Sequence, residues 1–184
     1  MANKFDEFVL SEQERSKAAK GIAVDWEARK TEWLGHIETL FEQAGEFLRP
    51  YLDAHQISVR YRPVKLNEQY LGSYSAKEML ISIGTKTVKL EPVGTLIIGS
   101  RGRVDVVGPF GRAVLVLLDS EIKEVSQLIR ISVSVGGKPP IPPPSKQASE
   151  VNWVWRIMAR PPRQAIVELN RDTFYSLLLE VANG

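Results

Sequence analysis

The spacing of the apolar residues changes near residue 56, and this change constrains the fold more than any other feature of the sequence. Before it, apolar residues recur at intervals of three, four and seven from Trp26 to Tyr51, which indicates a helix with one buried face. After it, apolar and polar residues alternate, beginning with Ile57, Val59 and Tyr61, which indicates half-buried strands. A long helix followed by many strands predicts an α+β fold.

The long helix is predicted over residues 25–51, with Pro50 marking its end. A shorter polar helix is predicted before it over residues 11–21, because the stretch SEQE has the form of a capping box. The glutamates of the long helix fall between its apolar positions and predict an acidic outer face. We interpret the apolar stripe as a core face, made of Trp26, Trp33, Ile37, Leu40, Phe41, Ala44, Phe47, Leu48 and Tyr51.

The strands after residue 56 are separated by short turns, with breaks predicted at residues 84–86 and 92–94. Such gaps are too short for crossover helices, so neighbouring strands are predicted to be antiparallel. The apolar run 113–118 predicts a central strand covered on both faces, and a further strand is predicted over 128–135. The fold expected is a curled antiparallel sheet of about seven to nine strands. The long N-terminal helix and a short C-terminal helix pack against it.

We expect a single domain over residues 1–184. Its helical part is 1–55, its antiparallel β part 56–135, and a proline-rich internal loop covers 136–150. A hairpin and the C-terminal helix occupy 151–184. The proline-rich loop can be a semi-rigid spacer, which we favour, or a polyproline ligand for a partner. The polar connection 67–77 is interpreted as a loop whose tyrosines line a shallow groove.

The composition points to an ordinary cytoplasmic protein. There is no cysteine, which excludes disulfides and thiolate chemistry. The sequence has no apolar run long enough to span a bilayer and no secretory signal at its start, so no membrane partner is expected. Residues 1–56 contain 7 Lys and Arg against 11 Asp and Glu, whereas residues 57–184 contain 17 against 11. This asymmetry can indicate a charged partner. We favour the interpretation that the two parts face each other or are both solvated.

One stretch has the residue types of a metal-dependent nuclease. Asp105 lies on a predicted strand, and Glu121 and Lys123 follow as Glu-Ile-Lys. Two carboxylates can hold Mg²⁺ or Mn²⁺, and the lysine can position the attacking water. Over some twenty residues the stretch resembles the restriction-endonuclease-like superfamily. That resemblance implies a metal site at Asp105 and Glu121, with Lys123 as the catalytic lysine.

The same residues also fit an ordinary pair of strands. The hydrophobic strand ends at Leu118, so Glu121 and Lys123 would lie on the connection that follows it. Asp105 would then face water beside Arg101 and Arg103, while its apolar neighbours on the strand face the core. We favour this interpretation and keep the nuclease as an alternative.

The predicted hairpin over 151–169 is the best candidate binding surface in the sequence. Its tryptophans share one face of a strand and its arginines gather around the turn, so the candidate binding residues are Trp153, Trp155, Arg156, Arg160 and Arg163. Aromatic and arginine side chains together can bind nucleic acid or a protein surface. Tryptophans that simply cover the core are the more common case.

The remaining motifs carry little chemistry. His36 and His55 have no carboxylate or cysteine partners that would make a metal site, and GSRGR over 99–103 is interpreted as a hairpin turn. We therefore predict a non-catalytic binding module without a cofactor, acting through a protein partner or a second copy of itself. The nuclease, which would use Mg²⁺ or Mn²⁺, and a nucleic-acid binder acting through the hairpin are the alternatives.

Overall fold

The computed structural model describes residues 25–95, 100–128, 151–159 and 165–183. These residues form one antiparallel sheet, two α-helices and a short 3-10 helix. In chain order the elements are α2 (Trp26–Asp53), β1 (Ile57–Glu68), β2 (Gly72–Ile83), β3 (Lys86–Gly94), β4 (Gly102–Gly108), β5 (Gly111–Asp119), η1 (Val125–Leu128), β6 (Trp153–Met158), β7 (Ile166–Glu168) and α3 (Arg171–Asn183).

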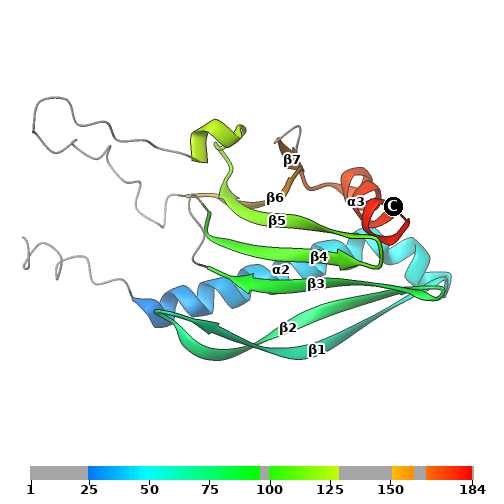
Figure 1. The fold of residues 1–184 in the computed structure, drawn as a ribbon, viewed down its shortest axis with the longest axis horizontal. Helices are drawn as coiled ribbons and strands as arrows, with labels where there is room; N and C mark the ends of the chain where they lie inside the picture. Colours follow the sequence, from blue (N-terminus) through cyan, green and yellow to red (C-terminus); the bar gives the residue numbers. More distant parts are fainter. Residues whose placement is uncertain (1–24, 96–99, 129–150, 160–164, 184) are drawn as a thin grey trace, which may run out of the picture.

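The sheet is a meander in which each strand pairs with the next one along the chain. Its order is β1-β2-β3-β4-β5-β6-β7, and every pairing is antiparallel. Helix α2 runs across one face of the sheet, and α3 packs at the end where β4 turns into β5 (Figure 1). The predicted α+β class and antiparallel sheet are confirmed, with seven strands among the described residues and an open rather than closed sheet.

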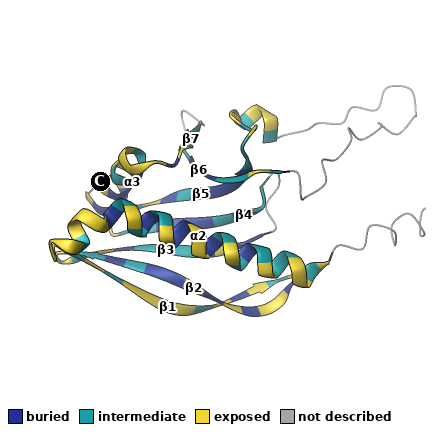
Figure 2. Cartoon of the chain, turned by 180° about the vertical axis from the view of Figure 1, so that it is seen from behind, coloured by how far each residue is buried: buried dark blue, intermediate teal, exposed yellow. Residues whose placement is uncertain are grey.

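Helix α2 packs most of its predicted apolar stripe against the sheet (Figure 2). The prediction is wrong for Tyr51, which is 41% exposed. Asp25 caps its start, because the carboxylate accepts the Ala28 N–H at 2.9 Å. The predicted end at Pro50 is wrong, since the helix continues to Asp53. A proline removes the bond that its own N–H would donate and crowds the carbonyl four residues earlier, but both effects fall on the preceding turn. Its carbonyl still accepts the Ala54 N–H at 3.3 Å, so one more turn can form.

Strands β1 and β2 form a long ribbon that extends well beyond the part of β2 that pairs with β3. The predicted loop 67–77 is wrong, because most of it belongs to β2 and only residues 69–71 form the turn. The buried residues of β2 change from even positions, Tyr74 and Ala76, to odd positions, Met79 and Ile81. Because the inward-facing positions change within β2, its sequence does not show one regular alternation of apolar and polar residues, and its first part was not predicted.

The prediction of a strand break at 92–94 is also wrong. Strand β3 runs through these residues to Gly94, with a register irregularity between Pro92 and Gly94. A proline is tolerated at such a bulge because the regular hydrogen bonding of the strands is already interrupted there. The central strand over 113–118 is confirmed: Leu115 and Leu117 face α2, and Val116 and Leu118 are buried although they point the other way.

Several predictions fall outside the described residues. These are the polar helix over 11–21, most of the strand over 128–135, the proline-rich loop 136–150, and Arg160 and Arg163 at the hairpin turn. The hairpin itself is present as β6 and β7, and the C-terminal helix as α3. None of the helices in the described part of the chain is long and apolar enough to cross a membrane.

Candidate functional site

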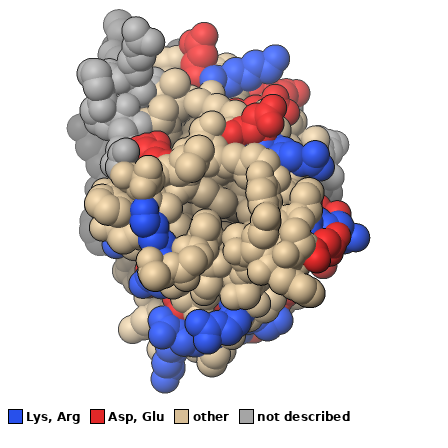
Figure 3. All heavy atoms as spheres, turned by 90° about the vertical axis from the view of Figure 1, so that its right-hand side faces the viewer, with Lys and Arg blue, Asp and Glu red and all other residues tan. Residues whose placement is uncertain are grey.

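An apolar cavity opens at the end of the sheet where α2 finishes and α3 packs. It has a volume of about 530 Å³. Figure 3 looks onto this end of the molecule and shows a hollow within a broad uncharged area, with charged side chains toward the margin. The cavity is lined by Leu48, Tyr51, Ile57, Ile83, Lys86, Tyr175, Leu178, Leu179, Ala182 and Asn183.

Helix α3 supplies half of the cavity wall because its apolar surface is wider than the core requires. Phe174 and Val181 are fully buried in the core. Tyr175 and Leu179 lie beside this buried face and line the cavity, and Leu179 is 66% exposed. An exposed leucine alone is ordinary. Here it completes a concave apolar surface instead of standing by itself.

Three contacts fix α3 in place around the cavity. The Tyr175 hydroxyl donates a hydrogen bond to the carbonyl oxygen of Phe47 on α2, and the Tyr51 and Tyr175 rings meet edge to face with centroids 5.6 Å apart. At the other end of α3, the Phe110 N–H donates to the Val181 carbonyl at 3.0 Å. Both ends of the helix are therefore tied down, so the cavity wall is preformed.

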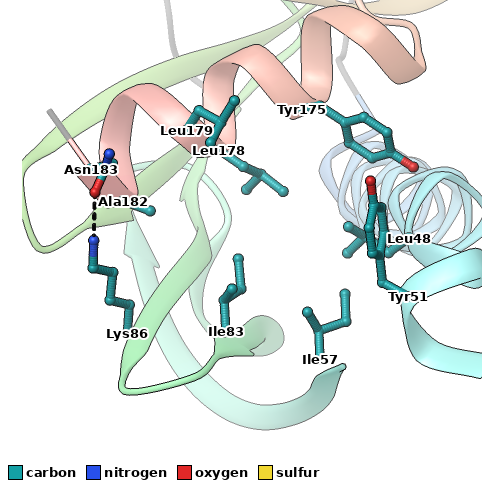
Figure 4. Close-up of a pocket in the computed structure, with 10 residues that line it drawn as sticks. All are labelled: Leu48, Tyr51, Ile57, Ile83, Lys86, Tyr175, Leu178, Leu179, Ala182 and Asn183. Carbon is teal, nitrogen blue, oxygen red and sulfur yellow. Dashed lines mark hydrogen bonds between the residues drawn. The ribbon is translucent and has the colours of Figure 1, made fainter. Parts of the chain in front are cut away.

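Polar groups lie at two opposite sides of the cavity (Figure 4). On one side Lys86 Nζ donates to the Asn183 side-chain oxygen at 2.8 Å, and it lies 5.2 Å from the centre of the Phe110 ring. On the other side are the hydroxyl groups of Tyr51 and Tyr175. Among the described residues that line the cavity, Lys86 is the only charged one. Such a surface suits a mainly apolar ligand with a polar end.

Comparison with known proteins does not identify the chain. No family model, curated protein or solved structure matches it. The candidate site therefore rests on the chemistry and geometry of this chain.

The structure does not bring the nuclease residues together. Asp105 lies on β4 opposite Val114 of β5. Strand β5 continues for five residues beyond Val114 to Asp119, a path of about 16 Å at the usual rise of a strand. Glu121 and Lys123 follow on the connection after β5, as the interpretation favoured from the sequence expects.

Asp105 has other partners. Its carboxylate accepts two hydrogen bonds from Arg103, at 2.6 and 3.1 Å, and lies 3.1 Å from an Arg112 nitrogen. The side chain is buried on the face of the sheet opposite α2. The predicted proximity to Arg101 is not observed, because Arg101 pairs instead with Glu32 of α2 at 2.6 Å. Asp105 thus pairs with two arginines on this face of the sheet. The expectation that it faces water is wrong, since it is only 3% exposed.

The hairpin tryptophans face α2 and the core. Trp155 is buried, its indole N–H donates to the His36 carbonyl at 3.1 Å, and its ring lies 6.0 Å from that of Trp33. Trp153 lies on the same side of β6, 5.3 Å beneath the Arg101 guanidinium. Arg156 points to the opposite face, 4.0 Å from Glu168. The structure therefore separates the tryptophans from Arg156 rather than forming one mixed surface.

A polar cluster at the N-terminal half of α2 is a second feature that the sequence did not reveal. The Arg101 guanidinium lies between Glu32 and Trp153. Burial lowers the pKa of Arg29, and the nearby charge of Arg101 lowers it further. The side-chain Nε groups of both arginines are buried without a hydrogen-bond partner. This cluster joins GSRGR to the helix, so that motif is more than a turn.

The His, Asp and Glu side chains of the described residues, which could act as metal ligands, do not form a cluster. No group of three or more His, Asp or Glu side chains that could hold a metal ion occurs among them. His36 Nε2 lies 3.7 Å from Glu32, and His55 follows α2 with a φ of 54°.

Sequence reasoning missed the cavity because its residues come from four separate segments. Helix α3 carries five of them, and the other three segments carry only one or two each. Each segment is apolar enough to be assigned to the core. The one usable signal was α3, where Tyr175 and Leu179 add apolar surface beside the predicted face of Phe174, Leu177, Leu178 and Val181.

Proposed function

We propose that this protein is a non-catalytic binding module that holds an apolar small molecule in the cavity between α2, the β2–β3 turn and α3. The cavity itself carries the proposal. An open space of about 530 Å³ with an almost wholly apolar lining lies within the usual range for small-molecule sites, about 300–1,000 Å³.

The chemistry of the lining favours binding over catalysis. The described residues around the cavity offer one ammonium, two phenols and one amide, and no carboxylate, imidazole or thiol. General acid–base or nucleophilic catalysis needs paired groups within hydrogen-bond reach of each other and of the substrate. Apolar burial can supply affinity here without any such pair.

The test is a fluorescence titration with the neutral probe N-phenyl-1-naphthylamine. The wild type should bind one probe per chain with saturation. Leu179→Gln replaces an exposed wall residue, so it should weaken binding about five-fold without unfolding the protein. The matched control is Val93→Gln, which changes an exposed apolar residue that does not line the cavity. Unsaturable binding, or equal binding by both variants, contradicts the proposal.

Self-association through the same end of the molecule is a second candidate function. Three large apolar side chains are exposed there: Tyr51 at 41%, Phe110 at 61% and Leu179 at 66%. Exposed apolar patches of this kind often mark contacts between proteins. Sedimentation velocity over a range of protein concentrations tests it. A dimer that Phe110→Ser dissociates supports this function, and a monomer at all concentrations excludes it.

A further inference from the structure

We propose that the ligand is an anionic amphiphile whose carboxylate pairs with Lys86 and whose straight apolar tail fills the cavity. This inference rests on the proposed binding function and adds the chemical class of the ligand. Lys86 is the first residue of β3, at the mouth of the cavity and partly exposed. It is placed to hold a charged group near water while the rest of the ligand is buried.

The side-chain ammonium of Lys86 has hydrogen-bonding capacity to spare. An ammonium group donates three hydrogen bonds, and among the described residues its side-chain acceptor is the neutral amide of Asn183. Other cations on the sheet pair with carboxylates, as Lys77 does with Glu38 and Arg62 with Glu78. Lys86 has no such partner within the described part of the chain, so its charge is left for a bound anion.

The tail has a defined direction. Figure 4 shows Ile83, Ile57 and Leu178 between Lys86 on one side and the two tyrosines on the other. A carboxylate at Lys86 therefore sends its tail across these three side chains toward Tyr51 and Tyr175. Affinity should increase about four-fold with each added methylene, until the tail outgrows the cavity.

Lys86 has another role that the experiment must separate from ligand binding. Helix α3 ends at Asn183, and a cation near the C-terminus of a helix stabilises it. A purely structural lysine would affect the folding of α3 and the binding of every ligand alike. A lysine that recognises the head group would affect only anionic ligands.

The experiment is displacement of N-phenyl-1-naphthylamine by dodecanoate, dodecanol and dodecyltrimethylammonium, each below its micelle concentration. These ligands share one tail and differ in charge. The wild type should bind dodecanoate about ten-fold more tightly than dodecanol, and the cation most weakly. Lys86→Met keeps most of the aliphatic stem, so it should remove the ten-fold preference while weakening dodecanol binding far less than dodecanoate binding. Lys86→Arg should restore much of the preference.

The control is Lys89→Met on the same strand, because Lys89 does not line the cavity. This variant should keep the full preference for dodecanoate. Equal wild-type affinity for dodecanoate and dodecanol overturns the anionic ligand and leaves the apolar binding site standing. Loss of all three ligands in Lys86→Met, with a lower melting temperature, assigns Lys86 a structural role and overturns the inference. A probe that never binds contradicts the proposed function itself.

Discussion

The ring of Trp33 lies directly against the backbone of Gly102. A Cβ atom at Gly102 would lie 2.2 Å from Cζ3 of the indole, far closer than van der Waals contact. Trp33 is 1% exposed and belongs to α2, and Gly102 begins β4. The absence of a side chain at this one position therefore allows the long helix to lie close on the sheet.

Gly102→Ala should destabilise the protein strongly, because the added methyl group forces Trp33 out of its place. The expected loss in the free energy of unfolding is about 1–3 kcal/mol, measured by urea denaturation. Gly35→Ala on α2 is the matched control, since a Cβ there meets nothing within 4 Å. It should stabilise by up to about 1 kcal/mol through helix propensity. Equal effects from both changes would contradict the close contact.

The fold was largely predictable from the sequence because its two hydrophobic periods are clear. The stripe from Trp26 to Tyr51 can be satisfied only by a helix on a core, and closely spaced strands can only pair antiparallel. The errors lie where local rules conflict with tertiary structure. Pro50 is tolerated one turn from a helix end, and the β1–β2 ribbon changes its inward face near Glu78.

The candidate site was much less predictable than the fold. A cavity depends on how far apart packed elements stand, and residue spacing along one element does not encode that distance. Lys86 follows the turn at residues 84–85 and resembles any exposed turn lysine in the sequence. Its place at the cavity is visible only in the folded chain, where Asn183, almost a hundred positions later in the sequence, lies beside it.

Asp105→Asn should lower stability, because the carboxylate is buried and pairs with both Arg103 and Arg112. Both arginines are partly exposed and can turn toward water, so the cost should be about 1–3 kcal/mol rather than that of a fully buried pair. Chemical denaturation measures it. The nuclease alternative expects a different result: an unchanged fold, together with Mn²⁺ binding by the wild type that disappears in the variant. Calorimetric titration of Mn²⁺ distinguishes the two.

Alkaline pH should destabilise the protein through Tyr74. Burial raises the pKa of this phenol, and its hydrogen bond to Glu68 raises it further. As the pH increases past about 10, the unfolded chain loses the phenolic proton before the folded chain does. The free energy of unfolding should therefore fall above that pH, by up to about 1 kcal/mol per pH unit.

Tyr74→Phe should separate this effect from general alkaline unfolding. The variant loses the hydrogen bond to Glu68 and should be about 1 kcal/mol less stable at neutral pH, but its stability should fall less steeply above pH ~10. Tyr70→Phe changes a phenol that is 55% exposed and should keep the wild-type slope. A Tyr74→Phe slope identical to that of the wild type would show that another group causes the alkaline loss.

Gly108→Ala should displace α3 and damage the cavity together. A Cβ at Gly108 would lie 2.2 Å from the carbonyl oxygen of Val181, and this backbone atom cannot move without the helix. The same carbonyl accepts the Phe110 N–H, so that bond should be lost as well. We expect a loss of about 2 kcal/mol in the free energy of unfolding and weaker probe binding in the protein that remains folded. Gly45→Ala, where a Cβ has open space, should preserve probe binding. Normal probe binding by folded Gly108→Ala would mean that the position of α3 does not define the site.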